Sequence, residues 1–259
     1  MEILVVLGVG VGLIVIYKNR RWWNRWYVRV DQQQVRSTLA RNFAYYQQLS
    51  PDRQRIFEQR VVRLVRQKDF IGRGLSVTLA MKTLIAAAAV QLTFGLPEIV
   101  LQHFKRILIY PDKYYSTITH QYHKGEVNPA AQAIVLSWKN FVEGYAAPHD
   151  SLNLGLHEMA HALEIENLID NDEYDFLPPS VWEQWQQQAE EYRNGMSPGQ
   201  PDFFRAYAAT NDQEFFAIAV ENFFERPVEF QKQVPSLYST LASLLRQDPA
   251  TAVSSANHA

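Results

Sequence analysis

Residues 152–164 read LNLGLHEMAHALE, and this stretch decides the fold class that we expect for the chain. His157 and His161 stand four residues apart, with Glu158 directly after the first, in the pattern HExxH. Residues four apart lie on one face of a helix, so both imidazoles can reach one metal ion while Glu158 lies beside it. The apolar neighbours predict a buried helix, in which polar side chains need partners. The stretch therefore predicts a metal-binding helix, and the alternative is a chance motif on an ordinary helix.

The HExxH pattern supplies two ligands, and a catalytic zinc site needs a third protein ligand and one open position. The chain has no cysteine, and Glu164 and Asn167 stand where an extended HExxHxxGxxH motif has its glycine and third histidine. We therefore expect a carboxylate from a later helix. The candidates are Glu214, Glu221 and Glu225. Spacing favours Glu214 over Glu221 but leaves all three open.

The order of the expected elements indicates an α+β fold. Around the HExxH helix, hydrophobic periodicity and turn residues predict helices, then a few strands, then helices again. The expected helices cover residues 31–48, 51–67, 79–94, a stretch from 152, 180–192 and 211–224, and the expected strands cover 106–110 and 133–138. This order favours a mainly helical α+β domain with a small sheet over an alternating βαβ fold.

The composition excludes several classes of protein. The 259 residues carry a formal net charge of −2, so the chain lacks the basic character of a nucleic-acid-binding protein. The absence of cysteine excludes a cysteine nucleophile, disulfide bonds and thiolate metal sites.

The N-terminal segment predicts a membrane anchor. Residues 3–17 read ILVVLGVGVGLIVIY, a run of about 22 Å as a helix, against the ~30 Å hydrocarbon core of a bilayer. Tryptophans and basic residues follow it and suit the membrane interface. A cleaved signal peptide and a buried core helix are the alternatives. We expect residues 1–30 to form a single-pass anchor with the following domain in the cytoplasm, residues 31–249 to form that domain, and residues 250–259 to be a disordered tail.

Several segments resemble one known family. LNLGLHEMAHALE and residues 206–227, AYAATNDQEFFAIAVENFFERP, resemble the Mlc titration factor A family of zinc peptidases. LIAAAAVQLTFGL, RILIYPD and AIVLSW resemble upstream segments of that family in the same order, so the resemblance spans roughly residues 45–249. The two metal-site segments also resemble the catalytic domain of anthrax lethal factor.

The resemblance implies a zincin-like, gluzincin-type metallopeptidase with a Zn²⁺ cofactor. It implies that His157 and His161 are ligands, that Glu158 is the general base, and that Glu214 is preferred to Glu221 as third ligand. By the same resemblance Tyr207 would stabilise the oxyanion of the intermediate. Two features depart from the family: Glu164 replaces the aspartate of its HExxHxLD pattern, and a membrane anchor is not typical of its soluble members.

The sequence is therefore compatible with two functions. The first is a zinc-dependent peptidase that hydrolyses peptide bonds of a peptide or protein substrate, with Glu158 as general base. The alternative is a metal-stabilised regulatory protein that sequesters a transcriptional regulator with little turnover. The family takes its name from binding a repressor, but nothing in this sequence supports that partner. Residues 133–138 are expected to form either an edge strand that pairs with substrate beside the metal or a plain interior strand.

Overall fold

The computed structural model describes residues 30–116, 120–147, 150–169, 171, 173, 175–196, 203–205, 208 and 210–251. The expected mainly helical α+β domain with a small sheet is confirmed. A first group of helices precedes most of the strands: α2 (Gln32–Asn42), α3 (Ala44–Gln47), α4 (Pro51–Gln67) and α5 (Leu79–Thr93). A second group follows them: α6 (Trp138–Ala146), α7 (Leu154–Leu168), α8 (Pro179–Gly195), α9 (Asp212–Glu225), α10 (Pro227–Gln233) and α11 (Pro235–Leu245).

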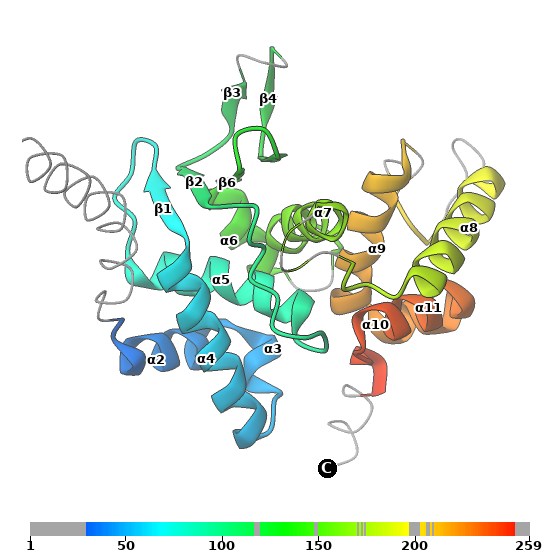
Figure 1. Ribbon diagram of the computed structural model, residues 1–259, viewed down its shortest axis with the longest axis horizontal. Coiled ribbons are helices and arrows are strands. Elements are labelled where there is room, and N and C mark those ends of the chain that lie inside the picture. Colours follow the sequence, from blue (N-terminus) through cyan, green and yellow to red (C-terminus); the bar gives the residue numbers. More distant parts are fainter. Residues whose placement is uncertain are drawn as a thin grey trace, which may run out of the picture.

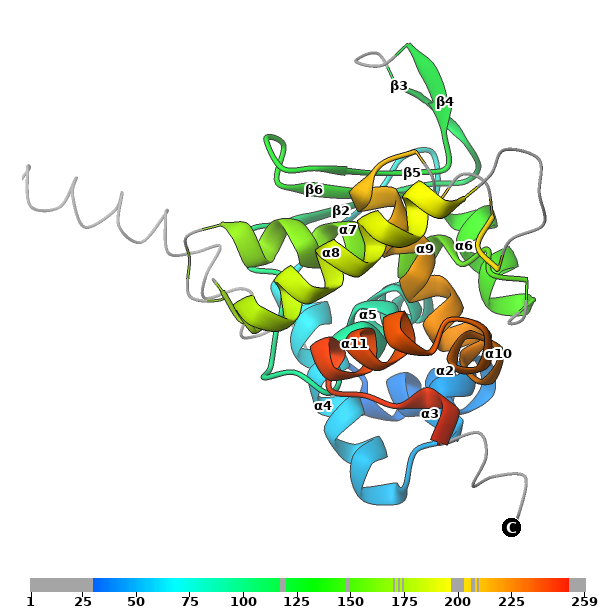
Figure 2. The same ribbon diagram turned by 90° about the vertical axis from the view of Figure 1, so that its right-hand side faces the viewer.

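The main sheet has the strand order β1-β2-β6-β5 and is mixed. Its members are β1 (Asp69–Gly72), β2 (Arg106–Tyr110), β6 (Ala133–Ser137) and β5 (Gly125–Asn128). β1, β2 and β6 are parallel, whereas β5 pairs antiparallel with β6. A separate hairpin of β3 (Tyr114–Ser116) and β4 (Gln121–His123) projects beyond the sheet, and the helices lie on the opposite side of the sheet (Figure 2).

The order of the strands decides between the two roles open to residues 133–138. β6 lies between β2 and β5, and all five of its residues are buried, so it is the interior strand. The edge strand next to it is β5, whose sequence GEVN contains one apolar side chain and gave no strand signal. β1, with the short sequence DFIG, is likewise not among the expected strands.

The core forms around α5, the helix expected over residues 79–94. Eleven of its fifteen residues are buried, and α5 packs against α2, α4 and α7 (Figure 1). The helix expected over 31–48 is divided at Phe43, which has an extended backbone conformation. The buried ring of Phe43 packs against Phe57 and Tyr145, and this contact explains the break. Ser50 is the N-cap residue of α4, but its side chain makes no capping hydrogen bond.

The described residues include no helix that is both long and apolar enough to cross a bilayer, and residues 1–29 of the expected anchor (residues 1–30) lie outside them. At the other end, Ala250 is buried and its N–H donates to the Tyr238 hydroxyl at 3.0 Å. The packed chain thus continues past residue 249, and residues 252–259 of the expected tail are outside the description.

Candidate metal centre

Helix α7 carries the HExxH motif into the interior. Asn153 caps the helix, and its side chain accepts a hydrogen bond from the Leu156 N–H at 3.0 Å. The cap side chain satisfies one of the backbone donors that every helix start leaves unpaired. The helix packs against α5 and α9 and against strands β5 and β6, so it lies between the helical core and the sheet edge.

Three predicted ligands converge at this helix. His157 Nε2 lies 3.2 Å from His161 Nε2. Glu214 approaches from the first turn of α9, with Oε2 at 3.3 Å from His157 Nε2 and Oε1 at 3.6 Å from His161 Nε2. Asn211 caps α9 and accepts a hydrogen bond from the Glu214 N–H at 2.9 Å. The cap thus fixes the turn that carries the carboxylate.

The donor set and its spacing match a tetrahedral metal ion. Each of the three residues offers one ligand atom, and all three atoms lie within 4.8 Å of one another. Two ligands about 2.1 Å from a tetrahedral zinc ion lie about 3.4 Å apart. The distances of 3.2, 3.3 and 3.6 Å are close to that value, although the last two run to different oxygens of Glu214. His157, His161 and Glu214 can therefore hold a metal ion together.

The protonation of the two imidazoles also indicates a site for a cation. Burial by itself would lower the pKa of His157, but hydrogen bonds with Glu214 and Glu221 raise it to about 10. Burial, followed by the charge of His157, lowers the pKa of His161 to about 4. The nearby carboxylates thus favour a positive charge at His157. A metal ion could supply that charge, since ligand histidines must be neutral.

Glu221, an alternative ligand in the sequence, lies behind His157 instead. Its Oε1 is 2.7 Å from His157 Nδ1, the nitrogen that faces away from His161. Glu221 is almost completely buried, at 1% exposure, and accepts hydrogen bonds from Arg205 (2.7 Å) and from the Asn153 N–H (2.7 Å). Such a carboxylate fixes the tautomer and the orientation of a ligand histidine. Arg205 also donates to the Ser151 carbonyl, and no sequence signal pointed to it.

Two further glutamates, the third candidate ligand Glu225 and the Glu164 that replaces the aspartate of the family pattern, have other environments. Glu225 accepts a hydrogen bond from Asn153 Nδ2 at 3.0 Å, away from the three converging ligands. Glu164 Oε2 is buried without a hydrogen-bond partner among the described residues, so this carboxylate oxygen orients neither histidine. Tyr207 lies outside the described residues.

Glu158 lies at the border between α7 and the edge strand. Its side chain is buried, and a Cβ atom added to Gly125 would come within 2.3 Å of Glu158 Oε1. Only glycine therefore leaves room for the carboxylate at this point of β5. Burial, partly offset by the charge of His157 and reinforced by the neighbouring carboxylates, raises the pKa of Glu158 to about 7. A group with that pKa can accept and release a proton near neutral pH.

A cleft of about 900 Å³ opens onto these residues. Residues 122–127, which run from β4 into β5, line one side, and His157, Glu158, His161 and Glu214 line another. Among the described strands, β5 pairs with β6 alone. An extended chain in the cleft would therefore lie between a sheet edge and the converging ligands.

The comparisons with known proteins agree with this geometry. The model of the glucose-regulated metallo-peptidase M90 family matches residues 19–246. An uncharacterized protein of Synechocystis sp. is 26% identical over 266 residues, covering 95% of this chain and 97% of the relative. Mlc titration factor A of Yersinia pestis (strain Pestoides F) is 29% identical over 230 residues, covering 77% of this chain and 79% of the relative.

Proposed function

The chain belongs to the M90 family of metallopeptidases, and from this premise we propose that it is a zinc-dependent peptidase that hydrolyses peptide bonds in the cleft beside α7. The observation that supports this most directly is the convergence of His157, His161 and Glu214 next to a buried carboxylate. Two imidazoles and one carboxylate are the ligand set of catalytic zinc in many peptidases, and they leave one position open.

Each residue of the site has a separate role in the proposed reaction. His157, His161 and Glu214 hold the ion, and Glu221 orients His157. Zinc, when bound, lowers the pKa of water and polarises the carbonyl of the scissile bond. Glu158 accepts a proton from the attacking water and delivers it to the leaving nitrogen. Tyr207, by the family resemblance, donates a hydrogen bond to the oxygen that becomes negatively charged.

We propose that β5, rather than β6, is the strand that binds the substrate backbone. β5 forms the edge of the sheet and lines the cleft, and an extended peptide can add to such an edge through main-chain hydrogen bonds. Gly125 would then place the peptide backbone beside the Glu158 carboxylate.

The test is Glu158→Gln, which keeps the shape of the side chain and removes the base. We expect peptide hydrolysis to fall roughly 100- to 10,000-fold with the zinc content unchanged. Glu164→Gln removes another buried carboxylate of the same helix and serves as the control, with expected wild-type activity. Cleavage of a peptide library and elemental analysis of both variants and the wild type provide the measurements. Equal cleavage by wild type and Glu158→Gln would refute the assignment of the base.

A second candidate comes from the name of a relative. Mlc titration factor A is named for titrating Mlc, which raises a regulator-binding function with little turnover for this chain. That function does not need the base. This candidate replaces the peptidase if the wild-type protein cleaves no peptide and Glu158→Gln binds a regulator as the wild type does.

We also propose that residues 1–30 tether the domain to a membrane and that the domain faces the cytoplasm. The support is the sequence: an uncharged run over residues 3–17, followed by tryptophans and by basic residues from Lys18 onward. Alkaline extraction of membranes tests this. The full chain should stay in the pellet, and a chain without residues 1–29 should be released.

A further inference from the structure

A second cavity, separate from the metal centre, lies between α2, α4 and the segment that leads from α5 to β2. Its volume is about 780 Å³, and none of the residues that line it line the metal cleft. Six cationic side chains line it, against the single carboxylate of Glu58: Arg36, Arg55, Arg63, Arg66, Lys68 and Lys105. Val35, Val62 and Val100 are buried and give the wall an apolar part.

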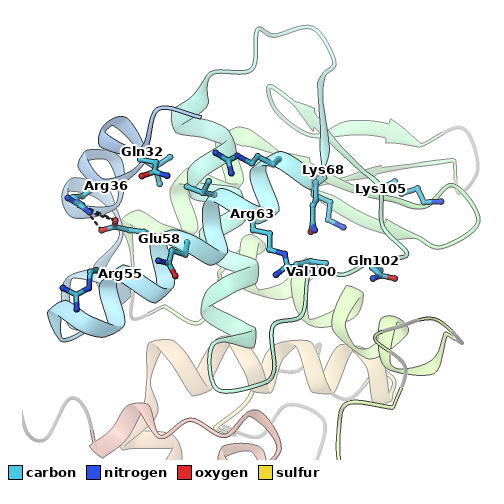
Figure 3. A pocket seen from close by; sticks show the side chains of 14 residues that line it. Gln32, Arg36, Arg55, Glu58, Arg63, Lys68, Val100, Gln102 and Lys105 are labelled. Carbon is cyan, nitrogen blue, oxygen red and sulfur yellow. Dashed lines mark hydrogen bonds and ion pairs between the residues drawn. The ribbon is translucent and has the colours of Figure 1, made fainter. Parts of the chain in front are cut away.

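Some of these cations have partners and others do not. Arg36 forms a bidentate pair with Glu58 at one end of the cavity, and Arg63, Lys68 and Lys105 lie toward the other end (Figure 3). Arg63 pairs with Glu98 at 2.5 Å. Within the described part of the chain, no carboxylate pairs with the exposed side chains of Arg66 and Lys105. The cavity therefore has uncompensated positive charge at the end formed by α4 and the segment before β2.

The wall of the cavity is held in place from the interior. Lys68 Nζ donates to the Leu101 and Phe104 carbonyls at 2.5 and 2.6 Å. Glu173 accepts the N–H groups of Val100 and Gln102 at 2.7 and 3.0 Å. Such bonds fix the loop before any ligand arrives, and a preformed cavity loses less entropy on binding than a flexible one.

Gln67 adds a specific chemical requirement. It lines the cavity, and its Oε1 is buried without a hydrogen-bond partner in the described structure. A buried acceptor that lacks a donor costs free energy. If the Gln67 side chain turned toward the cavity, a hydroxyl group of a ligand would satisfy its oxygen. The walls thus suit an anion next to a hydroxyl group, with an apolar part attached.

We propose that this cavity binds a phosphate ester that carries a hydroxyl group and an apolar part, the chemistry of a phosphoglycerol headgroup with its acyl chains. Gln32 lines the cavity and lies fifteen residues after the uncharged run of residues 3–17, so a membrane tether would hold the cavity near lipid headgroups. The flank between them carries Lys18, Arg20, Arg21, Arg25 and Arg29, whose charge would repel this segment from the cavity. Charge complementarity thus favours an anionic ligand over the chain's own N-terminal segment. The proposal that the ligand comes from a membrane rests on the proposed tether, whereas the proposed chemistry of the ligand does not.

The experiment uses the full chain in a neutral detergent and native mass spectrometry or calorimetry with soluble probes. Dihexanoyl phosphatidylglycerol supplies all three features, dihexanoyl phosphatidylcholine has no net charge, and glycerol phosphate has no acyl chains. We expect one phosphatidylglycerol to bind per chain, with affinity falling on the order of tenfold or more in the double variant Arg66→Gln, Lys105→Gln. The matched control Arg73→Gln, Lys232→Gln removes two exposed cations that do not line the cavity and should bind like wild type.

Each outcome decides the proposal. Equal binding of phosphatidylcholine, or equal loss in both double variants, would overturn it. If glycerol phosphate binds as tightly as phosphatidylglycerol and depends on the same two cations, the phosphate site stands and the source is a soluble phosphate ester. Peptide cleavage by the Arg66→Gln, Lys105→Gln protein should equal that of wild type, so failure here is distinguishable from failure of the proposed peptidase.

Discussion

Glu221 Oε1 lies 2.7 Å from His157 Nδ1, so the glutamate that could have been the third ligand holds the first ligand from behind. Glu214 and Glu221 are seven residues apart on α9, two turns along the same face. α9 packs against α7, so the two carboxylates reach opposite nitrogens of one imidazole.

We predict that Glu221→Gln weakens zinc binding roughly 10- to 100-fold without removing a ligand. The physical reason is that the amide is a poorer acceptor for the Nδ1 proton and leaves Arg205 without its carboxylate. Competition with a zinc chelator measures the affinity. Glu225→Gln changes a carboxylate one turn further along α9 and should retain wild-type affinity. An unchanged affinity in Glu221→Gln would contradict the role of this carboxylate in orienting His157.

Zinc itself should stabilise the fold, independently of any turnover. A ligand that binds only the folded state raises its stability by mass action. We therefore predict that adding zinc to chelator-treated protein raises the melting temperature, and that His161→Ala removes this increase. Differential scanning calorimetry with and without zinc provides the measurement. The idea fails if His161→Ala responds to zinc as strongly as the wild type.

Gly125→Ala should impair the base without affecting the metal. The added Cβ would lie 2.3 Å from Glu158 Oε1, so the carboxylate must move. We expect peptide cleavage to fall by at least tenfold, because small displacements of a catalytic group are costly. Gly195→Ala is the matched control, since a Cβ there meets no atom within 4 Å. Full activity in Gly125→Ala would show that Glu158 does not need this space.

The sequence predicted most reliably what depends on local spacing. HExxH fixes His157 and His161 on one helix face whatever surrounds them, and the apolar run over residues 79–94 predicted α5. The choice between Glu214 and Glu221 depends on how α9 lies against α7, which spacing on one helix does not determine. β5 was not predicted because its sequence, GEVN, gives no apolar pattern. This agrees with its position, since all four residues are only partly buried. Arg205 lies outside any helix or strand, and its importance arises only from the tertiary contact with Glu221.

Glu164 has a buried carboxylate oxygen, Oε2, without a hydrogen-bond partner among the described residues. Burial raises its pKa to about 7 from an ordinary value of 4.5, and no charged group contributes to this shift. Between these two values the unfolded chain has released the proton and the folded chain retains it. The folded state therefore binds more protons, and the free energy of unfolding falls as the pH rises through this window.

We predict that Glu164→Gln raises the free energy of unfolding by about 3 kcal/mol at pH 8, with little change at pH 4.5, because the amide carries no charge to bury. Urea unfolding at pH 4.5, 6 and 8 measures the difference between variant and wild type. Glu225, whose pKa burial also raises to about 7, is present in both proteins and cancels in that difference. Glu183→Gln, at an exposed position of α8, should follow the wild-type pH dependence. If Glu164→Gln shows the same pH dependence as the wild type, the carboxylate is solvated in the folded protein and its burial is refuted.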